Sequence, residues 1–140
     1  MHAPADGESP HKGRRGLRRL LSAFFYSLSG LAIAFRHESA FRQEIAMAVV
    51  LLPVACLIPV AAVERVLLVA SVLLVLVVEL LNSSVEAAID RIGLDTHRLS
   101  KRAKDLGSAA VLVALAILAL TWGALAAPVL AAWVAAGAAA

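Results

Sequence analysis

Apolar residues dominate three long stretches of the chain. The first, residues 45–63, contains no charged residue. The second, residues 65–91, includes thirteen consecutive uncharged residues and then keeps a helical pattern through polar positions. The third, residues 106–128, belongs to an uncharged segment that continues to Ala140. Because a helix rises about 1.5 Å per residue, roughly 20 residues cross the hydrocarbon core of a membrane. We expect one membrane-spanning helix in each stretch, with Pro128 ending the third helix and "AAWVAAGAAA" forming a terminal tail.

A different pattern precedes the first predicted span. Between residues 14 and 36, apolar residues recur at spacings of three and four, and basic and hydroxyl residues fall mainly on the other side. The apolar positions are Leu17, Leu20, Leu21, Phe24, Leu28, Leu31 and Phe35. Such a basic amphipathic helix is suited to the membrane interface. Residues 1–13 are polar and predict a disordered N-terminal arm, so residues 37–140 remain for the three-span domain.

Composition and charge agree with a membrane protein. Hydrophobic residues make up 61% of the 140 residues, against about 45–50% in a soluble domain. Lysines and arginines gather before the first span and between the second and third, whereas only Arg65 lies between the first and second. Because positively charged loops stay in the cytoplasm, we expect a cytoplasmic N-terminus and an external C-terminus. The single cysteine, Cys56, excludes an intramolecular disulfide and a multi-cysteine metal site.

Polar residues gather on one face of the second predicted span. At 100° per residue, five of them fit on a face about 100° wide. These are Glu79, Asn82, Ser83, Glu86 and Asp90. A charged side chain at the membrane centre costs roughly 2.5–3.5 kcal/mol on insertion scales, so we expect this face near the cytoplasmic interface. Two simpler interpretations stay open: Asp90 can be a solvated helix end, and Asn82 or Ser83 can join helices by hydrogen bonds.

Two further polar clusters are expected at the same interface. "RHESAFRQE" offers Glu38 and Glu44 before the first span, and "KRAKDLGSAAVL" offers Lys104 and Asp105 before the third. Carboxylates, an amide and basic groups suit phosphoryl transfer, which needs a hard cation, positive charge beside the phosphates and a group that orients the acceptor. The sequence has no G-x-x-x-x-G-K-[ST] loop, no G-x-G-x-x-G and no kinase catalytic-loop signature, which excludes a soluble-type nucleotide fold.

Three segments, "ESAFRQE", "VELLNSSVEAAIDRIG" and "SKRAKDLGSAAVLV", resemble the prokaryotic diacylglycerol kinase family. The similarity covers about Arg19 to Trp122. It implies an all-α integral membrane fold with three transmembrane helices and an N-terminal amphipathic surface helix. It also implies a homotrimeric helical bundle with shared active sites, in the bacterial inner membrane with a periplasmic C-terminus. The implied reaction is ATP-dependent phosphorylation of the primary hydroxyl of diacylglycerol, giving phosphatidate and ADP, with Mg²⁺ as cofactor and no nucleic-acid partner.

The resemblance also implies roles for individual residues. Glu79 matches the catalytic carboxylate that takes the proton of the lipid hydroxyl, and Glu38 and Glu86 match the metal ligands. The expected nucleotide-binding residues are Arg19, Tyr26, Glu38, Glu86, Asp95, Thr96, His97, Lys104 and Asp105. The expected substrate-binding or supporting residues are Arg19, Glu44, Glu79, Asn82, Asp90 and Ser108.

Other functions remain to be distinguished. A related branch of the family phosphorylates undecaprenol and keeps the same polar face, so this face does not decide the lipid substrate. A small multidrug transporter predicts a lone acid near the membrane midplane and usually four spans. A non-enzymatic membrane scaffold is separated from an enzyme by measured ATP turnover.

Overall fold

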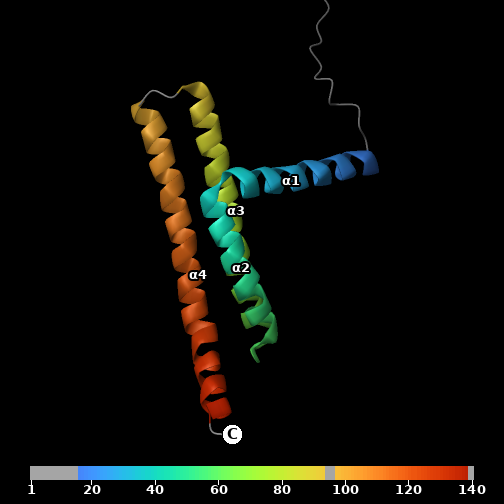
Figure 1. Ribbon diagram of the computed structural model, residues 1–140, viewed down its shortest axis with the longest axis vertical. Helices are drawn as coiled ribbons and strands as arrows, with labels where there is room; N and C mark the ends of the chain where they lie inside the picture. Colours follow the sequence, from blue (N-terminus) through green and yellow to red (C-terminus); the bar gives the residue numbers. More distant parts are fainter. Residues whose placement is uncertain (1–15, 94–96, 139–140) are drawn as a thin grey trace, which may run out of the picture. The chain divides into compact units, whose positions relative to one another are not determined.

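The computed structural model describes residues 16–93 and 97–138, and these residues form four helices (Figure 1). They are α1 (Leu17–His37), α2 (Ser39–Leu57), α3 (Ala62–Ile92) and α4 (Arg98–Ala138). The prediction of an all-helical protein is confirmed. By length and composition, each of the four helices could cross a membrane.

The chain divides into two compact units, Met1–Ile33 and Ala34–Ala140. The first unit contains most of α1, where the sequence predicts an amphipathic helix. Its large apolar side chains, among them Leu20 and Phe24, are exposed within this single chain. A helix therefore forms as expected, and it carries an apolar face that a lipid surface could cover. The predicted disordered arm, residues 1–13, lies outside the described residues.

The break between α1 and α2 occurs without a glycine or a proline. Glu38 adopts an extended backbone conformation, with φ −101° and ψ 115°. The guanidinium group of Arg42 donates hydrogen bonds to the carbonyls of Phe35 and Arg36, at 3.3 and 3.2 Å. The last carbonyls of a helix lack partners within the helix, and a basic side chain can satisfy them. Arg42 therefore stabilises the turn that places Glu38 ahead of α2.

A second arginine stabilises the connection between α2 and α3. Arg65 donates hydrogen bonds to the carbonyls of Ala55 and Cys56, and to that of Ile58 at 3.2 Å. The first apolar stretch predicts a span over residues 45–63. The helix observed there, α2, begins earlier, at Ser39, and ends earlier, at Leu57. Pro59 explains the early end, since the residue before a proline is pushed toward extended conformations. Ile58 adopts such a conformation, with φ −69° and ψ 145°.

α3 packs against both α2 and α4 in the second unit (Figure 1). Two apolar clusters hold these helices together. The first contains Ala48, Val72, Val75, Ala114 and Leu118, and the second contains Ala55, Ile58, Leu68 and Ala126. Trp122 packs against both clusters, and its indole N–H donates to the carbonyl of Leu68 at 3.3 Å. Alanines from α2 and α4 face branched side chains of α3, which lets the helices approach closely.

The prediction that the third apolar helix ends at Pro128 is wrong. α4 includes Pro128 and continues to Ala138. A proline inside a helix removes the hydrogen bond to the carbonyl four residues earlier, but it does not prevent the next turns from forming. The residues that follow are mainly alanine, the strongest helix former, so the helix resumes. The predicted terminal tail is thus helical as far as it is described.

Candidate functional site

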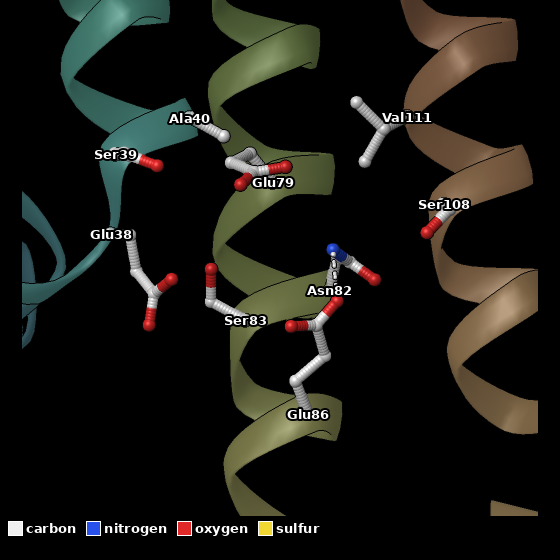
Figure 2. A pocket seen from close by; sticks show the side chains of 9 residues that line it. All are labelled: Glu38, Ser39, Ala40, Glu79, Asn82, Ser83, Glu86, Ser108 and Val111. Atoms are coloured by element: carbon white, nitrogen blue, oxygen red, sulfur yellow. Dashed lines mark hydrogen bonds between the residues drawn. The ribbon is translucent and has the colours of Figure 1, made fainter. Parts of the chain in front are cut away.

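A polar pocket lies where the start of α2 meets α3 and α4 (Figure 2). Its volume is about 340 Å³. The lining residues are Glu38, Ser39, Ala40, Glu79, Asn82, Ser83, Glu86, Ser108 and Val111. The structure therefore brings together six polar residues that the sequence singled out, drawn from three separate segments. These six are Glu38, Glu79, Asn82, Ser83, Glu86 and Ser108.

α3 supplies four of the lining side chains from one face. Glu79, Asn82, Ser83 and Glu86 follow the three- and four-residue spacing of a helix, so they project to the same side. Glu79 is only 4% exposed, although it is a carboxylic acid in a helix otherwise rich in leucine and valine. Acidic residues are almost never this buried without a partner or a function. Glu79 is therefore the most informative single residue in the pocket.

Asn82 is hydrogen-bonded to the pocket residue Glu86 and lies close to Gly107 of α4. Its side-chain amide donates a hydrogen bond to Glu86 Oε1 at 3.1 Å. Its Oδ1 atom is buried and has no hydrogen-bond partner within the described residues. A Cβ atom at Gly107 would overlap that Oδ1 and lie 3.2 Å from Asn82 Cγ. Gly107 thus leaves the space in which the Asn82 side chain reaches across toward α4.

Two carboxylates in the pocket come from different segments of the chain. Glu38 stands directly before α2, where Arg42 stabilises the backbone turn, and Glu86 projects from α3 (Figure 2). Within residues 16–93 and 97–138 there is no cluster of three or more histidine, cysteine or acidic residues suited to a metal ion. Mg²⁺ is usually bound by one or two carboxylates together with waters and substrate phosphates. Oxygen ligands from Glu38 and Glu86 fit that pattern, because the phosphates would complete the site.

Glu44 is buried close to the pocket but does not line it. It is 7% exposed, and its Oε2 atom has no hydrogen-bond partner in the described structure. It lies near enough to Glu79 for the two carboxylates to interact electrostatically. A substitution of Glu44 would therefore affect the pocket through its electrostatic interaction with Glu79, and not through direct contact with a bound ligand.

Lys104 and Asp105 lie outside the pocket, and each has an ion-pair partner. Lys104 Nζ is 2.7 Å from Asp90 Oδ1, which joins α4 to α3. Lys101 Nζ is 2.6 Å from Asp105 Oδ2, one turn along α4. Lys101, Lys104 and Asp105 all precede the uncharged part of α4. The hydrogen bond with Asp90 raises the pKa of Lys104. Lys104 therefore stays charged, but a phosphate would have to share it with Asp90.

The remaining predicted residues are placed as follows. His97 accepts a hydrogen bond from the backbone N–H of Leu99 at 3.2 Å, so it caps the start of α4. Arg19 and Tyr26 lie on α1, in the other compact unit, where Tyr26 is exposed. Asp95 and Thr96 lie outside the described residues.

Sequence reasoning missed three lining residues and one spacer. Ser39 and Ala40 directly follow Glu38, and Val111 lies one turn after Ser108, so a helical projection from the known positions would have found them. Gly107 offered a weaker signal, a glycine inside a helix-forming run. Such a glycine usually has a packing or functional reason.

Fold and site together define a helical membrane protein with a carboxylate-lined pocket at the junction of three helices. The sequence model of the family described as prokaryotic diacylglycerol kinase matches residues 25–126. A protein of Pseudomonas aeruginosa named diacylglycerol kinase is 54% identical over 114 residues, which are 81% of this chain and 93% of the relative. The chain belongs to this family.

Two further relatives carry the same name. Diacylglycerol kinase of Escherichia coli K12 is 50% identical over 107 residues, 76% of this chain and 88% of the relative. Diacylglycerol kinase of Helicobacter pylori strain 26695 is 43% identical over 119 residues, 85% of this chain and 92% of the relative. The alignments therefore cover most of both chains in each comparison.

Proposed function

We propose that this protein transfers the γ-phosphoryl group of ATP to the primary hydroxyl of diacylglycerol, giving phosphatidate and ADP. The observation that carries the proposal is the position of the buried Glu79 in one pocket with the carboxylates of Glu38 and Glu86. Relatives named diacylglycerol kinase, 40–54% identical over most of the chain, support the same reaction. The protein is thus a membrane-embedded lipid kinase.

Glu79 acts as the general base. Its carboxylate accepts the proton of the lipid hydroxyl while the hydroxyl oxygen forms a bond to the γ-phosphorus. The bond between that phosphorus and the bridging oxygen breaks, and the electron pair leaves with ADP. Proton transfer by a positioned side chain contributes typically 10²–10⁴-fold to a rate, so its removal should be plainly measurable. The apolar helices around Glu79 suit an acceptor whose hydroxyl enters from the lipid.

Glu38 and Glu86 are the residues that would hold Mg²⁺, together with the phosphates of ATP. When bound, this cation offsets negative charge on the phosphate oxygens during transfer. Asn82 orients Glu86 through its hydrogen bond. The remaining nucleotide contacts are assigned to Arg19, Tyr26, Asp95, Thr96, His97, Lys104 and Asp105. Glu44, Asp90 and Ser108 support the site.

The active form is a homotrimer in which neighbouring subunits complete each site. A pocket of about 340 Å³ is at the low end of the roughly 300–1,000 Å³ typical of small-molecule sites, which is little space for both a nucleotide and a lipid. We assign α1 to the membrane surface and α2, α3 and α4 to the three spans. Residues 14–36 and 37–140 are then the surface helix and the kinase domain. The N-terminus is cytoplasmic and the C-terminus periplasmic, in the bacterial inner membrane.

The test is lipid-dependent ATP consumption by the purified protein in detergent with Mg²⁺, comparing diacylglycerol with undecaprenol and wild type with Glu79→Gln. We expect turnover with diacylglycerol far above undecaprenol, and loss of turnover in Glu79→Gln without loss of the trimer. A preference for undecaprenol would keep the mechanism and reject the substrate. No turnover with either lipid from a folded trimer would favour a non-enzymatic scaffold.

A further inference from the structure

α4 extends beyond the rest of the helical bundle. Ala126 is buried beside Ile58 in the connection after α2, and Leu130 packs against the same cluster. The residues after Leu130 form a further helical segment, residues 131–138, which we call the α4 extension. Figure 1 shows α4 running past the end of α2. Residues 131–137 are exposed, including Trp133 at 55%.

The charges of the second unit mark where the membrane begins and ends along α4. Lys104 and Asp105 precede the uncharged segment that starts at Leu106. Arg65 lies at the opposite end, where it donates hydrogen bonds to the carbonyls at the end of α2. From Leu106 to Leu130 the helix covers about 37 Å, which already exceeds a hydrocarbon core of about 30 Å. The α4 extension therefore lies outside the hydrocarbon core, at the lipid head groups or in the water beyond them.

The composition of the α4 extension suits that layer better than water. Its sequence, "AAWVAAGA", contains one tryptophan and no charge. Tryptophan is enriched at membrane interfaces, because its ring is apolar and its N–H can reach polar groups. Pro128 precedes the segment, and a proline inside a helix permits a bend at that point. The segment contains no basic residue, so its binding to the membrane should not depend on anionic lipids.

We propose that the α4 extension binds the lipid head-group layer on the membrane side opposite the polar pocket, with Trp133 as its anchor. The segment lies outside the region matched by the family, residues 25–126, so the family does not account for it. An anchor there would fix the height of α4 and hence of Ser108 in the pocket. This proposal rests on α4 spanning the membrane and is independent of the catalytic roles.

The two tryptophans of the chain allow a direct depth measurement. Trp122→Phe leaves Trp133 as the only tryptophan, and Trp133→Phe leaves Trp122, about 16 Å further inside along the helix. Both variants are reconstituted in neutral phosphatidylcholine vesicles that carry bromine either near the head groups or deep in the acyl chains. We expect Trp133 to be quenched at least twofold more by shallow bromine than by deep bromine. Trp122 should show the reverse preference.

Three results would overturn the proposal. Strong quenching of Trp133 by aqueous acrylamide with none by bromine would place the α4 extension in water. Stronger quenching by deep bromine would place it in the hydrocarbon core of a tilted helix. Protection from both quenchers would place it between copies of the chain. If Trp122→Phe fails to fold, the difference between wild type and Trp133→Phe gives the same depth for Trp133.

Discussion

Gly107→Ala tests whether the contact between α4 and the Asn82 side chain positions the site. The added methyl group would overlap Asn82 Oδ1, so Asn82 must turn away or α4 must shift. The clash is with the end of a side chain, which turns more readily than a packed helix shifts, and a turn of Asn82 breaks its hydrogen bond to Glu86. The substitution therefore displaces a proposed metal ligand without touching an ionisable group.

Two opposing effects set the expected magnitudes. Alanine in place of glycine favours a helix interior by about 0.8–1.0 kcal/mol. Overpacking costs about 1–3 kcal/mol, so the stability of the variant should fall by about 2 kcal/mol or less. A hydrogen bond to a charged group contributes about 1.5–3 kcal/mol, and its loss in the transition state lowers the rate roughly 10- to 150-fold. Activity should thus fall roughly 10- to 150-fold in a protein that loses about 2 kcal/mol of stability or less.

The matched control is Gly123→Ala in the same helix, where an added Cβ would meet no atom within 4 Å. The assays are lipid-dependent ATP consumption over a range of Mg²⁺ concentrations and thermal unfolding in detergent. We expect Gly107→Ala to lose activity and to need more Mg²⁺. Gly123→Ala should keep wild-type activity and gain about 0.8–1.0 kcal/mol of stability. If Gly107→Ala keeps full activity at the wild-type Mg²⁺ requirement, the reasoning that Asn82 orients Glu86 is refuted.

Three further substitutions test contacts around the bundle. Arg65→Gln removes a charged donor from the carbonyls at the end of α2, so thermal unfolding in detergent should show a loss of about 1.5–3 kcal/mol, with the KM for ATP unchanged. Arg42→Gln should raise the Mg²⁺ concentration for half-maximal activity several-fold, because the turn that places Glu38 before α2 loosens. If activity instead falls by the same factor at limiting and at saturating Mg²⁺, Arg42 does not position Glu38 for the metal ion. Lys104→Gln should raise the KM for ATP at least tenfold. The control is Lys101→Gln, which loses only an exposed ion pair within one helix and should change the KM less than twofold. Equal effects of the two substitutions would contradict the proposal that Lys104 binds the nucleotide.

Contacts within one helix could be predicted from the sequence, because they follow from the helical repeat alone. The repeat placed Glu79, Asn82 and Glu86 on one face of α3, and the structure has them in one pocket. Helix ends were harder to predict, since they depend on interactions outside the helix. The Arg65 side chain binds the carbonyls at the end of α2, and the alanine-rich turns after Pro128 continue the helix.

Contacts between helices depend on how far each helix is rotated and shifted against its neighbour, which no periodic pattern specifies. The ion pair between Lys104 and Asp90 joins residues that the sequence suggested for separate purposes, a phosphate contact and a solvated helix end. The closeness of Gly107 to Asn82 suggests what fixes this alignment, because only a glycine leaves room for the amide. The same alignment then sets Lys104 beside Asp90, one turn before the pocket. A nucleotide phosphate that binds Lys104 would compete with Asp90 for it, so ATP binding and the contact between α3 and α4 should be coupled.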